Sequence, residues 1–206
     1  MRALDIPFTE HLEPFAGGFG ESRKAYRSFS PTGLVPCLVD GDTVVWESLA
    51  NVEYVAEHSS AVWPEDRRAR AWGRSACAEM HSGFSALRDE CSMNCGVRVE
   101  LTAISEPLQA DINRLDALWH QGLNTFGGPF LAGASFTAAD AFYAPVVFRA
   151  QTFSLPLSQP AQAYVDRMLA LPAMKDWYQA ALQEPWRETM HEEETVKSGR
   201  LIEDHR

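Results

Sequence analysis

The sequence is short of positive charge, which limits the partners that the protein can bind. Its 206 residues contain 18 Lys and Arg against 28 Asp and Glu, a formal net charge of -10 at pH 7. Nucleic acids and anionic membranes are bound through basic surfaces, so we expect neither as a partner. No apolar run approaches the roughly 18 residues of a membrane span, and no signal peptide opens the chain, so the expected location is cytoplasmic.

Cysteine is also sparse, since four residues in a chain of this length do not make a disulfide framework. Cys37 follows a proline at the start of a predicted strand, and Cys77 shares an apolar helical face with Cys91. Cys91 and Cys95 lie one helical turn apart, which leaves open a metal or redox pair with His81 as a third ligand. Because buried cysteine is common and no fourth ligand has zinc spacing, we predict no metal site.

The chain is 46% hydrophobic, enough to bury one large core or two smaller ones, and its pattern changes near Trp63-Pro64. Short strand-like runs precede that point and long helical periods follow it. This order predicts an α/β domain at 1–62 and an all-α domain at 63–186. The acidic tail at 187–206 lacks a sustained apolar stripe, so we expect it to be mobile or draped on the surface.

The most informative local pattern lies between residues 30 and 50. Val35-Pro36 opens the first of two apolar runs, 35–39 and 44–46. Asp40-Gly41-Asp42 separates the runs, which predicts a β-hairpin. A prolyl bond adopts cis at modest cost, and a cis bend would present the backbone of Val35 to an extended ligand. Proline before a strand is also common in purely structural settings, so this pattern alone decides nothing.

A helical pattern begins at Glu47-Ser48, directly after the hairpin. The N-terminus of a helix carries free N–H groups and partial positive charge, so Ser48 marks a site for a carboxylate. Glu47 beside it suits an ammonium group, and together the two residues fit a zwitterionic ligand. The structural alternative is a plain helix cap with a favourable charge in the first turn.

Two further patterns belong to the predicted helical domain. Spacings of three and four predict one helix of about seven turns; it carries Trp72, Ala76, Met80, Phe84, Leu87 and Cys91. Thr137 and Asp140 have the spacing of an N-capping box, with Asp in the position usually held by Glu or Gln. Pro145 lies inside the helix that this box starts and should kink it.

The Val35-Pro36, Glu47-Ser48 and Thr137-Asp140 motifs, in this order and spacing, resemble the glutathione S-transferase family. The resemblance runs from Arg2 to about Trp186 and implies a thioredoxin-like N-terminal domain followed by a transferase-type helical domain. It implies a homodimer, glutathione as co-substrate and a small electrophile as its partner. The residues implied for glutathione binding are Val35, Pro36, Glu47 and Ser48. Those implied for the electrophile pocket, unless they are core, are Leu87, Arg88 and Cys91, whereas Thr137 and Asp140 are structural.

Within the family, the run Thr137-Ala138-Ala139-Asp140 continuing to Pro145 and Phe153 is most similar to bacterial proteins near the zeta class, which include maleylacetoacetate isomerases. The Arg that such isomerases use for a substrate carboxylate falls at Thr152 here. That difference argues against a maleyl-type acid, unless neighbouring Arg149 substitutes. Asn51 stands where the family usually has Ile, and an unpaired amide there would cost stability.

The resemblance places residues 3–12 at the end of the family's first helix, a turn and the second strand. The first strand and the loop with the catalytic Ser, Tyr or Cys have no counterpart, so we expect the catalytic residue to lie upstream of Met1 and the N-terminal domain to be truncated. Three resolutions are open. The protein begins upstream, or Phe8 to Leu12 pairs directly beside Val35 to Val39, or the N-terminal part is disordered.

Two functions remain from the sequence. The first is a glutathione S-transferase-like enzyme that conjugates or isomerises a small electrophile, which the peptide anchors favour. The second is a non-catalytic module of the same fold that binds a ligand or a protein, which the missing catalytic loop and Asn51 favour.

Overall fold

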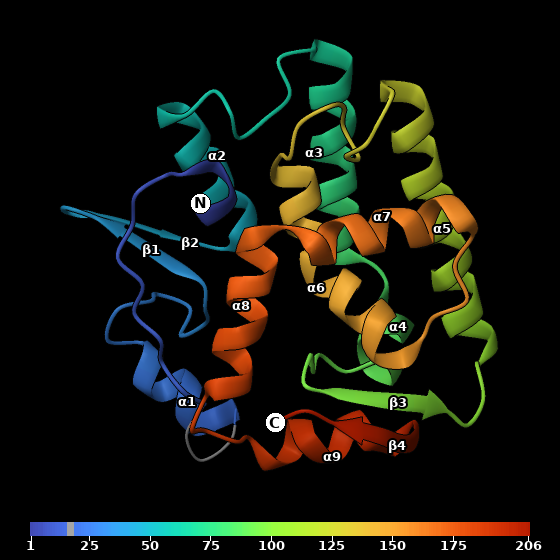
Figure 1. The fold of residues 1–206 in the computed structure, drawn as a ribbon. Helices are drawn as coiled ribbons and strands as arrows, with labels where there is room; N and C mark the ends of the chain where they lie inside the picture. Colours follow the sequence, from blue (N-terminus) through green and yellow to red (C-terminus); the bar gives the residue numbers. More distant parts are fainter. Residues whose placement is uncertain (16–18) are drawn as a thin grey trace.

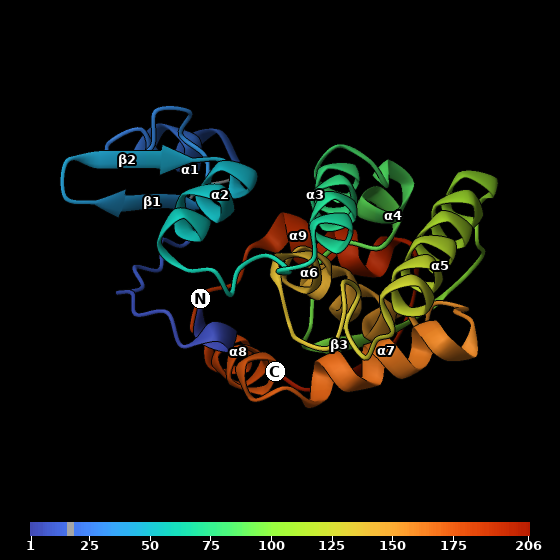
Figure 2. The same cartoon turned by 90° about the horizontal axis from the view of Figure 1, so that it is seen from above.

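The computed structural model describes residues 1–15 and 19–206, which form a small lobe and a larger helical lobe (Figures 1 and 2). In chain order the elements are η1 (Arg2–Leu4), α1 (Phe19–Tyr26), β1 (Cys37–Asp40), β2 (Thr43–Trp46), α2 (Ser48–His58), α3 (Arg67–Ser82), α4 (Ser85–Glu90), β3 (Val97–Leu101), α5 (Glu106–Phe126), α6 (Ala138–Phe153), α7 (Gln159–Ala170), α8 (Pro172–Gln183), α9 (Thr189–Lys197) and β4 (Gly199–Asp204). Figure 2 shows the hairpin, α1 and α2 standing apart from the other helices. Among the described helices, none is long and apolar enough to cross a bilayer.

The predicted hairpin is present in the small lobe. β1 and β2 pair antiparallel, with Cys37 opposite Trp46 and Asp40 opposite Thr43. The turn needs a residue with positive φ, and Gly41 supplies it at 57° without the penalty of a Cβ. Helix α2 contacts both strands, and the phenol of Tyr54 donates a hydrogen bond of 2.9 Å to the Asp40 carboxylate. The hairpin and α2 therefore fold as one unit.

Of the three open resolutions, the one in which Phe8 to Leu12 pairs as a strand beside Val35 to Val39 is wrong. Residues 6–15 have no regular structure, Phe8 is 43% and Leu12 57% exposed, and β1 pairs with β2 alone among the described residues. The segment goes elsewhere because η1 packs on α8, where Leu4 and Ile6 contact the core of the helical lobe. The phenol of Tyr26 then donates to the Glu13 and Pro14 carbonyl oxygens, at 3.1 and 3.0 Å.

The predicted seven-turn helix is also wrong, because it is broken into α3 and α4. Asp66 caps α3 by accepting a 2.7 Å hydrogen bond from the Ala69 N–H. The helix ends at Ser82 with Gly83 as its C-cap, and Phe84 adopts a left-handed conformation with a φ of 57°. Phe84 is buried, so its packing compensates for the backbone strain of that conformation.

Helix α6 lies in the middle of the larger lobe, where it contacts α3, α7 and β3 (Figure 1). Its start confirms the predicted capping box of Thr137 and Asp140. The fully buried Asp140 carboxylate accepts hydrogen bonds from the N–H groups of Leu131 and Thr137, at 3.0 and 2.9 Å, and from the Tyr164 hydroxyl at 3.1 Å. Burial raises the pKa of this carboxyl, and the donors partly offset that rise. Pro145 lies inside the helix, which continues to Phe153.

The predicted helical domain contains one element that its pattern did not indicate, a two-stranded sheet. β4, which lies in the acidic tail, pairs antiparallel with β3, so this part of the tail lies on the surface and is not mobile. β3 buries Val97 and Val99, whereas the residues of β4 after Gly199 are exposed and carry no apolar alternation. Arg206 then pairs with Glu192 of α9 and with Asp204, where its Nη2 lies 2.9 Å from the carboxylate. Backbone pairing and these ion pairs hold the tail in place.

Candidate functional site

The predicted ligand residues gather at one end of the hairpin. The Val35-Pro36 bond is cis and leads directly into β1, while Glu47 and Ser48 follow β2 at the start of α2. Because Cys37 and Trp46 are paired across the hairpin, Pro36 and Glu47 flank the same end of the sheet. The structure therefore brings the four sequence-predicted binding residues to one surface.

Val35 offers its backbone at this surface. The residue is 45% exposed, and its N–H and C=O have no hydrogen-bond partner within the described residues. An extended ligand could pair with these groups as the next strand of a sheet would. The side-chain Nδ2 of Asn51 donates to the carbonyl oxygen of Pro36 at 3.5 Å, which connects α2 to the cis bend.

Asn51 is only partly satisfied by that contact. Its Oδ1 is buried and has no partner within the described residues, which agrees with the predicted cost of an amide at this position. A buried acceptor without a donor costs about 1–3 kcal/mol. The polar side chain is thus retained next to the site at the expense of stability.

Glu47 has an unusual backbone that the sequence did not indicate. Its φ of 71° and ψ of 130° are uncommon for a residue with a Cβ, and it occupies the cap position of α2 without a capping hydrogen bond from its side chain. The carboxylate is about half exposed at 47%. A strained residue with a half-exposed carboxylate at a helix start would be available to a ligand, whereas a simple cap would need neither feature.

Ser48 begins α2, an 11-residue helix. Within the described residues the N–H groups of 48–50 donate to no protein atom, and the first N–H of α2 with a partner is that of Asn51, 2.9 Å from the Glu47 carbonyl oxygen. Unpaired N–H groups and the positive end of the helix dipole favour an anion here. A carboxylate would therefore be favoured beside Ser48 and these N–H groups.

The larger lobe contributes a histidine to this surface, which sequence reasoning missed. His81, in the last turn of α3, places its Nε2 3.7 Å from Oε2 of Glu47. From the sequence, His81 was a candidate only as a third metal ligand beside Cys91 and Cys95. No local pattern signals the pairing, because the two residues lie on different helices.

Several serine hydroxyls lie earlier in the small lobe. Ser22 and Ser30 are buried, Ser28 donates to the Ala25 carbonyl oxygen at 2.9 Å, and the hydroxyls of Ser30 and Thr32 are 3.3 Å apart. The thiol of Cys37 donates to the Phe29 carbonyl oxygen at 3.4 Å. None of these contacts assigns a group to the activation of a ligand thiol.

The residues predicted for an electrophile pocket are mostly inside the protein. Leu87 and Cys91 are fully buried in the core, and burial raises the pKa of the Cys91 thiol to about 12. Arg88 is exposed, but its guanidinium donates to the carbonyl oxygens of Gly83, at 3.2 Å, and Met80. Their placement favours the packing role that the sequence left as the alternative.

Thr152 and Arg149, compared above with the carboxylate-binding Arg of isomerases, also make internal contacts. Thr152 is buried and donates to the Asn94 carbonyl oxygen. Arg149 donates to the Cys91 carbonyl oxygen at 2.7 Å, and burial lowers its pKa to about 10. Both side chains therefore brace the segment before β3.

The cysteines do not meet in a metal centre. Among the described residues, no group of three or more His, Cys, Asp and Glu side chains could hold a metal ion. Burial raises the pKa of the Cys77 thiol to about 12, and its sulfur lies 3.7 Å from the Ala138 carbonyl oxygen. Such thiols are packing groups at neutral pH rather than reactive thiolates.

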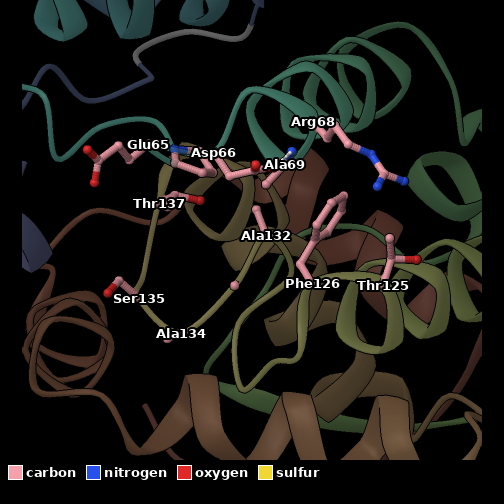
Figure 3. A pocket seen from close by; sticks show the side chains of 12 residues that line it. Glu65, Asp66, Arg68, Ala69, Thr125, Phe126, Ala132, Ala134, Ser135 and Thr137 are labelled. Carbon is pink, nitrogen blue, oxygen red and sulfur yellow. Dashed lines mark hydrogen bonds between the residues drawn. The ribbon is translucent and has the colours of Figure 1, made fainter.

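A separate surface groove of about 510 Å³ lies away from the hairpin, between the start of α3, the end of α5 and the loop before α6 (Figure 3). Glu65, Asp66 and Arg68 lie on one side of it, and Phe126 and Ser135 lie on the others. The side chains that converge on it carry both signs of charge, and none of the predicted site residues lines it except Thr137. Its residues give no reason to place the ligand site there.

Two family models match the chain. "Glutathione S-transferase, N-terminal domain" matches residues 1–58, and "Glutathione S-transferase, C-terminal domain" matches residues 65–180. Among curated proteins, a dichloromethane dehalogenase of Methylorubrum extorquens is 40% identical over 57 residues, which are 28% of this chain and 20% of that protein. The matched segment thus spans only one fifth of that relative's length.

Solved structures of similar proteins cover more of the chain. A theta class glutathione S-transferase from Xanthomonas axonopodis pv. citri, with glutathione bound, is 28% identical with a TM-score of 0.50, covering 78% of this chain and 77% of that one. A maleylacetoacetate isomerase from Methylobacterium extorquens AM1, with malonate and GSH bound, is 24% identical with a TM-score of 0.55. That match covers 77% of this chain and 78% of the isomerase, and at its identity it shows the fold alone.

Proposed function

Because the chain belongs to the glutathione S-transferase family, we propose that it binds glutathione at the end of the hairpin, between Val35-Pro36 and Glu47-Ser48. The observation that carries the proposal is the meeting of three complementary groups on one surface. They are the backbone of Val35, which has no partner among the described residues, the start of α2 without a side-chain cap, and the half-exposed carboxylate of Glu47. Each of them suits one part of a short zwitterionic peptide.

The roles of the residues follow from their chemistry. Ser48 and the free N–H groups beside it hold the carboxylate of the γ-glutamyl end, and Glu47 pairs with its ammonium group. The backbone of Val35 pairs with the cysteinyl part of the peptide, as in the addition of a strand. The theta class transferase named above, whose structure has glutathione bound, supports glutathione as the ligand.

We extend the proposal to the class of reaction. Glutathione held in this way would be conjugated to a small electrophile, or would assist its isomerisation, as a co-substrate whose thiolate is the nucleophile. The dehalogenase relative supports a small halogenated compound as the first electrophile to assay.

The proposal also includes a homodimer, a cytoplasmic location, and two domains at 1–62 and 63–186. Light scattering tests the dimer, and limited proteolysis near Trp63-Pro64 tests the boundary.

The binding role of Ser48 is tested by removing its hydroxyl. We expect Ser48→Ala to weaken the affinity for glutathione by about tenfold in isothermal titration calorimetry, because a charge-assisted hydrogen bond is lost. Ser85→Ala is the matched control, since Ser85 is also the first residue of a helix and is exposed. Equal loss in both variants, or no loss in either, would contradict the assignment.

A second candidate function is a non-catalytic binding module, and the buried, unpaired Asn51 Oδ1 beside the site favours it, since the module need not be optimised for turnover. Conjugation of glutathione to an aryl halide and to dichloromethane separates the two functions. Turnover that Ser48→Ala reduces supports the enzyme. Glutathione binding without turnover of either compound supports the module.

A further inference from the structure

His81 connects the larger lobe to the proposed glutathione site. It stands in the last turn of α3, with 40% of its side chain exposed, and its Nε2 lies 3.7 Å from Oε2 of Glu47. Glu47 is the residue to which the ammonium group of glutathione is assigned above. One carboxylate therefore faces two partners, the ammonium group of the ligand and a histidine.

The rest of the α2–α3 contact holds this pair in place. Arg74 of α3 forms a two-pronged ion pair with Glu53 of α2, at 2.9 and 3.0 Å. The Arg74 guanidinium also lies over the ring of Trp63, 5.4 Å from its centroid. Residues 47 and 53 of one segment meet residues 81 and 74 of the other, so the two helices run antiparallel. Glu47 and His81 are thus kept within reach of each other by a contact that does not involve the ligand.

The charge on His81 changes what Glu47 can offer to a ligand. A neutral imidazole leaves the negative charge of the carboxylate available. An imidazolium neutralises that charge and repels a second cation at the same oxygen atoms. Binding of an ammonium group at Glu47 must then weaken protonation of His81, and protonation must weaken binding by the same factor.

We propose that His81 is a positioning residue that acts through Glu47 and makes the affinity for glutathione fall as the pH drops from 7.0 to 5.5. The inference rests on the proposed function, because it requires the ammonium group of glutathione at Glu47. It identifies a residue of the second domain as a determinant of ligand affinity. It also predicts that glutathione binding releases protons when His81 is partly protonated.

The other charged groups around this pair make contacts of their own. Glu53 is paired with Arg74, and Glu79 of α3 is paired with Arg114 of α5 at 2.5 Å. From α4, Arg88 reaches the carbonyl oxygens at the end of α3. The other histidine of these helices, His58, lies at the far end of α2.

The test compares the affinity for S-hexylglutathione, which lacks a free thiol, at pH 7.0 and pH 5.5. For the wild type we expect the affinity to be on the order of three- to tenfold weaker at pH 5.5. The reason is that protonated His81 would compete with the ammonium group of the ligand for the half-exposed Glu47 carboxylate. For His81→Gln, which keeps a polar side chain without the charge, we expect a change of less than about twofold. For His81→Lys we expect the weaker affinity at both pH values, because its charge is fixed.

The outcomes separate this inference from the proposed function. Equal pH dependence in the wild type and His81→Gln overturns the role of His81 and leaves glutathione binding intact. No binding of S-hexylglutathione by the wild type at either pH overturns both. Calorimetry in buffers of different ionisation enthalpy adds a second readout, since proton release at pH 6 should be present in the wild type and absent in His81→Gln.

Discussion

Alanine at position 140 is expected to lower the free energy of unfolding by about 3–5 kcal/mol, because it leaves several donors without an acceptor. The Asp140 carboxylate is fully buried and receives the N–H groups of Leu131 and Thr137 and the hydroxyl of Tyr164. Each buried donor without a partner costs about 1–3 kcal/mol, and the cap at the start of α6 is lost as well. Urea denaturation followed by far-UV circular dichroism measures the change.

Asp176→Ala is the control for that experiment, since Asp176 is an exposed carboxylate on α8. It should change the unfolding free energy by no more than about 0.5 kcal/mol. A loss below about 1 kcal/mol for Asp140→Ala would mean that water or a shifted side chain satisfies the donors. The account of α6 as the anchored centre of the larger lobe would then fail.

The second large effect is expected at Trp119, in the middle of α5. Its side chain is fully buried, and its ring centroid lies 4.9 Å from that of Tyr164 and 5.8 Å from that of Tyr143. Trp119→Ala should cost about 3–5 kcal/mol of unfolding free energy, because the neighbouring rings cannot fill so large a cavity. The same urea titration measures it.

Trp119→Phe distinguishes the cavity from the polar group. The indole Nε1 of Trp119 is buried without a partner within the described residues, so phenylalanine removes an unsatisfied donor while it keeps most of the ring. We expect this variant to lose less than about 1.5 kcal/mol. Trp186→Ala, at an exposed tryptophan, is the control. A larger loss for Trp119→Phe than for Trp119→Ala would contradict the explanation.

The features that could be predicted from the sequence depend on neighbouring residues. The turn at Asp40-Gly41-Asp42 and the cap formed by Thr137 and Asp140 are decided within a few positions, and both are confirmed. The pairing of β3 with β4 could not be predicted, because β4 has no apolar alternation and its partner lies far away in the chain. The break between α3 and α4 at Phe84 could not be predicted either. The apolar spacing continues across it, although the backbone of Phe84 is left-handed.

The candidate site also has residues that the sequence predicts and residues that it does not. Val35, Glu47 and Ser48 were predicted from a local pattern and from a family resemblance, and the structure places them at one end of the hairpin. The pairing of His81 with Glu47 depends on how α2 and α3 pack, which no local spacing encodes. The strained backbone of Glu47 likewise has no sequence signal, because glutamate is not a residue that favours positive φ.

The central claim is that glutathione binds at the end of the hairpin, and a titration followed by ¹H–¹⁵N NMR tests it most directly. The account predicts that the backbone amides of Val35, Ser48 and Asn51 shift in a saturable way as glutathione is added. Amides of the separate groove, such as those of Phe126 and Ser135, should stay in place. Shifts confined to the groove, or none at Val35 and Ser48 at millimolar glutathione, would contradict the claim.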